Sequence, residues 1–148
     1  MPNIKTLIRG IVDMYDTDID IEYDEVTEYD HDENIIYFAL KGNADLDPCF
    51  LRHLRESHNC KFGEDIDIRL WALMHEIGHH FTLDNIDLDD EDIVRYMLGN
   101  YTTEEIKADP ALQNLYYDLP SEFKATEWAI RHIRRRLSFF RKVTAEMR

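Results

Sequence analysis

The chain has 148 residues, of which 44% are hydrophobic and 11% aromatic, a composition that fits a globular protein and excludes a disordered one. This length suits one hydrophobic core, and we expect a single domain over residues 1–148. The formal net charge of −14 argues against non-specific binding of the body to nucleic acid. The sequence has no apolar run of about 18 residues and no secretory leader pattern, so we expect a soluble cytoplasmic protein with no membrane partner.

The N-terminal part of the sequence predicts a helix, two strands and a second helix. Apolar side chains recur at helical spacing over residues 3–16, which indicates an amphipathic helix. Residues 18–24 alternate apolar and acidic side chains, and residues 34–40 form a continuous β-prone run, so both are predicted strands. The polar segment between them favours a hairpin whose second strand lies inside the sheet. Asp47 then begins a short helix that runs to about His58.

Two histidines and two cysteines in this part are candidates for metal ligands. His53 and His58 lie on the second predicted helix, and we predict surface histidines because neither has a partner at ligand spacing. Cys49 and Cys60 match neither a CxxC motif nor a paired CxxC zinc pattern. Free thiols in a reducing compartment are therefore the preferred interpretation, ahead of a disulfide or a second metal site.

The run His75-Glu76-Ile77-Gly78-His79 is an HExxH motif. It follows an apolar stretch without Pro or Gly, and Asp65 or Asp67 can cap a helix that runs to about Thr82. On such a helix the imidazoles of residues i and i+4 share one face and can bind one zinc ion. The glutamate between them points beside the ion, where it can act as general base and acid in peptide hydrolysis. The alternative is that these are ordinary polar residues of a helix.

The segment between the motif and residue 120 is acidic and contains two further helix starts. Residues 84–92 carry six acidic side chains but lack the glycine and the terminal glutamate of an EF-hand, so a solvated acidic segment is preferred to a calcium loop. Thr102 resembles the start of a capped helix, and Asp109 precedes Pro110 and a helix to Tyr117. We expect this segment to border the substrate groove. A phenol of Tyr116 or Tyr117 could stabilise an oxyanion, although core packing is favoured for both.

A catalytic zinc site commonly has three protein ligands and an open position, so a third ligand should follow the motif. Glu122 is the first candidate, because it opens a long predicted helix after Pro120. Small Ala125 lies one turn along, where another helix could approach closely. Glu127 and Asp118 are the competing ligands, and the simpler role for Glu122 is to complement the helix dipole.

Two stretches resemble the ImmA/IrrE-type metallopeptidases, small gluzincin-like proteins often carried by phages and mobile elements. Leu73–Phe81 is similar to the HELGH helix of that family, and Glu122–Ala129 is similar to its downstream helix of the form E-x-x-A-[ND]-x-F-A. Thr126 stands where the family more often has Asn or Asp, and Trp128 replaces the Phe.

The resemblance implies a zincin-like fold and a zinc-dependent peptidase with Glu76 as the catalytic base. The zinc ligands that it implies are His75, His79 and Glu122. It also implies a protein substrate, with a repressor-like regulator encoded beside the peptidase as the natural candidate.

The basic residues are concentrated at the C-terminus. Residues 131–148 hold seven Arg and Lys side chains and one acid, which leaves ten bases and 30 acids in the rest of the chain. Interspersed Leu137, Phe139, Phe140 and Val143 indicate a helix docked on the domain. We therefore interpret the charges as a solvated basic face, and a nucleic-acid contact is the lesser alternative.

Together these patterns predict an α+β fold in which a small β-sheet packs with the HExxH helix and further helices. The preferred function is a zinc metallopeptidase that hydrolyses a protein. The alternative from another class is a non-catalytic regulatory or protein-binding module that keeps the fold.

Overall fold

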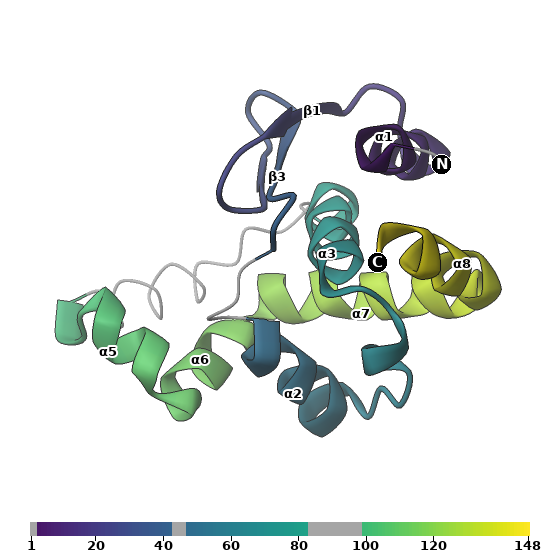
Figure 1. The fold of residues 1–148 in the computed structure, drawn as a ribbon. Helices are drawn as coiled ribbons and strands as arrows, with labels where there is room; N and C mark the ends of the chain where they lie inside the picture. Colours follow the sequence, from purple (N-terminus) through teal and green to yellow (C-terminus); the bar gives the residue numbers. More distant parts are fainter. Residues whose placement is uncertain (1–2, 43–46, 83–98) are drawn as a thin grey trace.

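The computed structural model describes residues 3–42, 47–82 and 99–148 (Figure 1). These residues form a mixed α+β fold with seven α-helices, one short 3-10 helix and a three-stranded sheet. The elements in chain order are α1 (Ile4–Tyr15), β1 (Asp20–Tyr23), β2 (Glu28–Asp30), β3 (Ile35–Phe38), α2 (Asp47–His58), η1 (Gly63–Asp65), α3 (Ile68–Thr82), α5 (Thr103–Ala108), α6 (Pro110–Tyr117), α7 (Pro120–Arg135) and α8 (Leu137–Met147). The predicted acidic segment of residues 84–92 lies outside the described residues.

The sheet has the order β1-β3-β2, and its pairing differs from the predicted hairpin. β1 pairs with β3 in parallel, whereas β2 and β3 form the hairpin, closed by Asn34 with a φ of 55°. The predicted turn therefore contains a strand. β3 occupies the middle of the sheet as predicted, with β1 on one side and β2 on the other. Its side chains Ile36 and Phe38 share one face and are both fully buried.

Local sequence signals fix the start of α3. The carboxylate of Asp67 accepts a hydrogen bond from the backbone N–H of Arg69 at 2.9 Å, so Asp67, and not Asp65, caps the helix. Trp71 and Ile77 are fully buried along it. The helix then runs to Thr82 without interruption, as the apolar pattern predicts.

The C-terminal helices confirm the predicted docking. α7 begins with Pro120 at its first turn, and after a break at Arg136 the chain continues as α8. Phe140 and Val143 of α8 are buried, whereas Phe139 is exposed and does not take part in the docking. The hydroxyl of Thr144 accepts a hydrogen bond from the backbone N–H of Asp67 at 3.0 Å, which ties α8 to the start of α3.

α3 and α7 touch backbone to backbone beneath the sheet (Figure 1). A Cβ atom placed on Gly78 would lie 2.6 Å from the carbonyl oxygen of Ala125 and 3.1 Å from its Cα. The close helix approach predicted at Ala125 is therefore confirmed. It depends on the missing side chain of Gly78, and it brings the first turn of α7 against the HExxH turn of α3.

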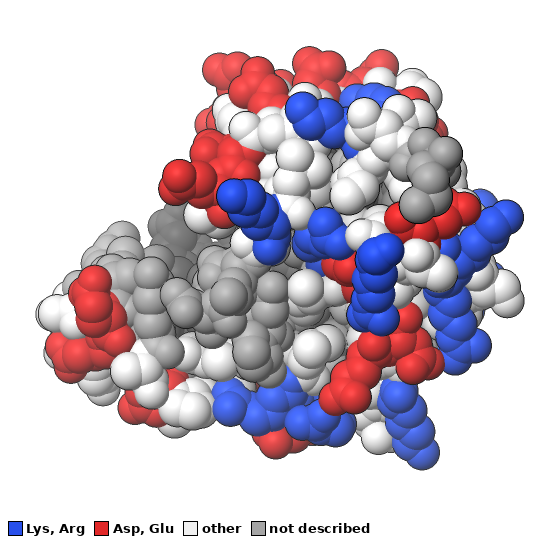
Figure 2. Space-filling view, viewed as in Figure 1, with Lys and Arg blue, Asp and Glu red and all other residues white. Residues whose placement is uncertain are grey.

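Charge is distributed unevenly over the surface. In Figure 2, Asp and Glu side chains gather over the sheet at the top, and Lys and Arg line the side where α8 lies. Arg131, Arg135 and Lys142 are exposed, as expected for a solvated basic face. None of the described helices is long and apolar enough to cross a membrane. Cys49 and Cys60 are both free thiols.

Candidate metal centre

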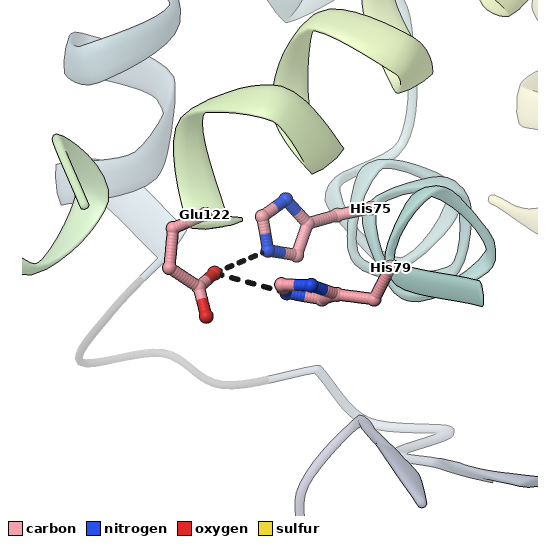
Figure 3. Close-up of side chains that lie close together, drawn as sticks. All are labelled: His75, His79 and Glu122. Atoms are coloured by element: carbon pink, nitrogen blue, oxygen red, sulfur yellow. Dashed lines mark hydrogen bonds and ion pairs between the residues drawn. The ribbon is translucent and has the colours of Figure 1, made fainter. Parts of the chain in front are cut away.

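Three side chains from two helices converge at the contact between α3 and α7 (Figure 3). His75 and His79 lie one turn apart on α3, and Glu122 lies in the first turn of α7. The Oε2 atom of Glu122 is 2.6 Å from Nε2 of His75 and 3.2 Å from Nε2 of His79. The structure thus brings together the three residues predicted as ligands.

The cluster is largely withdrawn from solvent. The side chains of His75, His79 and Glu122 are 10%, 16% and 12% exposed. Burial alone would raise the pKa of Glu122, but hydrogen bonds with both imidazoles and their charges outweigh it and hold that pKa well below its usual range. The carboxyl group is therefore ionised, and its Oε2 atom is within hydrogen-bond distance of both rings.

The donor set fits a divalent transition metal. Two imidazole nitrogens and one carboxylate oxygen form a ligand set of catalytic zinc sites. Ligand atoms about 2.1 Å from a tetrahedral zinc ion lie roughly 3.4 Å apart. The separation of 3.2 Å between Glu122 and His79 is close to this value, whereas the 2.6 Å contact between Glu122 and His75 would lengthen if an ion took its place. His75, His79 and Glu122 would hold the ion.

Thr126 orients His75 from behind. Its hydroxyl is fully buried and donates its single hydrogen to the carbonyl oxygen of Glu122 at 3.0 Å. The same hydroxyl oxygen lies 3.0 Å from Nδ1 of His75, so it must accept from that nitrogen. Nδ1 therefore carries a proton, and the Nε2 atom of the ring is directed at the ligand cluster. This role was not predicted from the sequence, which marked Thr126 only as a departure from a family motif.

Replacing Thr126 with Val is expected to weaken zinc affinity about 10–100-fold, because the ring of His75 loses the acceptor that fixes its tautomer. Thr126→Ser keeps the hydroxyl and is the matched control, with affinity expected within a few-fold of the original. Competition with a chromophoric chelator measures both affinities. Equal affinity of the Val and Ser variants would contradict the orienting role.

Glu76 lies beside the cluster and faces a cavity. Burial has the largest effect on the pKa of Glu76 and raises it, and the charge of Glu122 raises it further. The charges of His75 and His79 and a hydrogen bond from the backbone N–H of Tyr29 lower this pKa, but it stays above its ordinary value. A carboxylate with a raised pKa suits a group that must both take and return a proton. The cavity has a volume of about 260 Å³.

The walls of this cavity come from several elements. Glu76, His75 and Glu122 line the cavity. The lining also includes apolar side chains and the residues that lead into β2, among them Val26, Thr27, Glu28, Phe50, Ile68, Ala72 and Tyr117. Tyr117 is buried, in keeping with the favoured packing role, and it also faces the cavity. The side chain of Tyr116 lies outside the described part of the structure.

The competing third ligands do not reach the cluster. Glu127 is exposed on α7, and the carboxylate of Asp118 is 53% exposed with an oxygen 3.9 Å from Nδ1 of His53. His53 itself is fully buried, so the prediction of a surface histidine is wrong for this residue. Its Nε2 atom lies 3.2 Å from Nε2 of His58, which gives each histidine a partner that helical spacing alone did not indicate.

A second network joins the sheet to α3. His80, next to His79, lies 2.8 Å from a carboxylate oxygen of Asp16 at the end of α1 and 2.6 Å from the hydroxyl of Tyr29 in β2. α1, β2 and α3 are therefore joined at His80, the residue next to the candidate ligand His79. The sequence did not indicate this network, because its members are far apart along the chain.

Comparison with known proteins adds no assignment: no family model matches the chain, and no curated protein or solved structure is significantly similar to it. The chemistry of the site must therefore be argued from its residues.

Proposed function

We propose that the protein is a zinc-dependent peptidase with a zincin-like fold, in which His75, His79 and Glu122 hold the ion and Glu76 is the general base. The observation that carries the proposal is the meeting of the HExxH pair with a buried carboxylate 43 residues further along the chain. The resemblance of both stretches to ImmA/IrrE-type metallopeptidases supports the same roles.

In this proposal, different residues of the chain have separate roles in hydrolysis. Zinc, when bound, polarises a peptide carbonyl and makes a water molecule more acidic. Glu76 takes the proton from the attacking water at its carboxylate and passes it to the leaving amine. Thr126 keeps His75 in the binding tautomer, and apolar side chains form much of the cavity wall beside Glu76.

The position of the sheet supports a peptide substrate in extended form. β2 is an edge strand of the described sheet, and Thr27 and Glu28 at its start line the cavity that also contains Glu76. An extended segment can add to such an edge through backbone hydrogen bonds. We propose a protein substrate in the cytoplasm; by the family resemblance, a repressor-like regulator of a phage or mobile element is the first candidate.

The test is hydrolysis of a proteome-derived peptide library, followed by mass spectrometry. Zinc-loaded protein is expected to produce new peptide termini, 1,10-phenanthroline to abolish them, and added zinc to restore them, because the ion is required for the chemistry. Zinc-loaded protein that cleaves neither the library nor intact repressor-like proteins would favour the alternative function, a non-catalytic regulatory or protein-binding module.

A further inference from the structure

The cavity beside Glu76 follows one stripe of α3. Ile68, Ala72 and Glu76 succeed each other at intervals of four residues, so their side chains share one face of the helix, and all three line the cavity. Trp71 and Leu73, the neighbours of Ala72, are fully buried, whereas Ala72 is only partly buried. The stripe therefore faces the cavity and not the core, and it leads from Glu76 toward the start of α3.

Apolar side chains from three other parts of the chain face this stripe. Phe50 of α2 and Ala39, which follows β3, line the cavity and are buried. Val26, which precedes β2, also lines it but is 52% exposed, which places this residue at the rim. An apolar pocket with a rim that solvent reaches thus lies directly beside the proposed general base.

The size of the pocket matches a single large side chain. Its volume is about 260 Å³. An apolar cavity of about 150 Å³ is large enough to bind benzene, whereas sites for drug-sized ligands measure about 300–1,000 Å³. The pocket therefore has room for one aromatic or long aliphatic side chain. Part of this room exists because Ala72 is small, since a longer side chain at the same position of the stripe would extend into the cavity.

The same cavity contains the groups proposed for the chemistry. His75, Glu76 and Glu122 line it together with the apolar stripe. A peptide bond that is hydrolysed here has to come within hydrogen-bond reach of the Glu76 carboxylate. The side chains nearest to the pocket are then those of the residues that flank this bond. One of them can enter the pocket and bury its apolar surface against Phe50 and Ala72.

We propose that this pocket binds a large apolar side chain of the substrate next to the scissile bond, and that Ala72 sets the depth of the pocket. The proposal rests on the proposed function, because that function makes the ligand a peptide. Phe, Leu and Met are the side chains that fit. Glu28, which is exposed and also lines the cavity, repels an acidic side chain of similar length. The substrate is therefore a protein segment with a large apolar residue at the cleaved bond.

Binding of N-acetyl-L-phenylalaninamide and N-acetyl-L-alaninamide to the full chain, measured by ligand NMR, tests the pocket without hydrolysis. The phenyl compound is expected to bind at least about tenfold more tightly, because it buries more apolar surface. Ala72→Leu is expected to remove most of this difference and Ala72→Val part of it, with zinc content unchanged in both. Ala145→Leu, the same change at an exposed position of α8, is the matched control and should keep the full difference.

The peptide library gives a second measurement. The wild type is expected to cleave next to Phe, Leu and Met and to avoid Asp and Glu, and Ala72→Leu to shift cleavage toward Ala, Gly and Ser. Hydrolysis without a side-chain preference, or equal binding of the phenyl compound by the wild type and Ala72→Leu, would overturn the proposal. Failure of the peptidase proposal appears differently, as selective binding of the phenyl compound without cleavage of any peptide.

Discussion

Replacing Glu76 with Gln is expected to slow peptide hydrolysis by about 10²–10⁴-fold while zinc content stays at the wild-type value, because the change removes the proton acceptor and no ligand. The side chain of Glu76 keeps its shape as the amide, so the cavity and the neighbouring imidazoles should remain in place. The rate is measured on a peptide that the zinc-loaded wild type cleaves, and zinc by elemental analysis of the same sample.

Glu22→Gln is the matched control for this change. Glu22 also loses a negative charge, but it is exposed on β1 and lies outside both the cavity lining and the ligand cluster. Its rate is expected within a few-fold of the wild type. If Glu76→Gln hydrolysed the peptide as fast as this control, another group would have to be the base. If the wild type and both variants cleaved no peptide, the result would favour the alternative function, a non-catalytic binding module.

Local patterns in the sequence were sufficient for most helices and for the candidate ligands. The start of α3 at Asp67, the capping box of Thr102 and Glu105, and Pro120 at the start of α7 depend on residues within one turn of each other. The HExxH pair is also a local feature, because an α-helix fixes the direction of residues i and i+4. The prediction of Glu122 as the third ligand also needed the sequence pattern of a second helix.

Features that depend on pairing between distant segments were predicted less well. The acidic residues around Tyr29 indicate a turn, yet its hydroxyl bonds to His80, and this contact holds β2 as a strand against α3. β3 then pairs with β2 as a hairpin and with β1 in parallel. The prediction that His53 lies on the surface is wrong for the same reason. Tyr117 and Phe123 bury its ring, and they follow it by more than 60 residues along the chain.

Gly78→Ala is expected to weaken zinc affinity at least tenfold and to lower the free energy of unfolding by about 1–3 kcal/mol, the usual cost of an added methyl group in a packed contact. An alanine in a helix interior would ordinarily stabilise by about 1 kcal/mol over glycine. Here the new Cβ would meet the carbonyl oxygen of Ala125 at 2.6 Å. That neighbour is backbone, which cannot move aside without shifting α7.

The shift would be felt directly at the ligands. Glu122 lies one turn before Ala125 on α7, and its carboxylate oxygen is within 3.2 Å of both imidazole nitrogens of α3. Separating the helices moves this oxygen away from the nitrogens, so the three donors no longer meet at ligand distance. Denaturant unfolding of the metal-free protein measures the packing cost, and chelator competition measures the loss of affinity.

Gly10→Ala separates the steric effect from helix propensity. Gly10 is also within a helix, but it is exposed and a Cβ placed there has no neighbour within 4 Å. That variant is expected to be more stable than the wild type by up to about 1 kcal/mol, with unchanged zinc affinity. Opposite signs for the two substitutions would show that the contact of Gly78 with Ala125 sets the spacing of α3 and α7. Equal stabilisation by both would mean that the two helices can separate without cost, and that the position of Glu122 is set by other contacts.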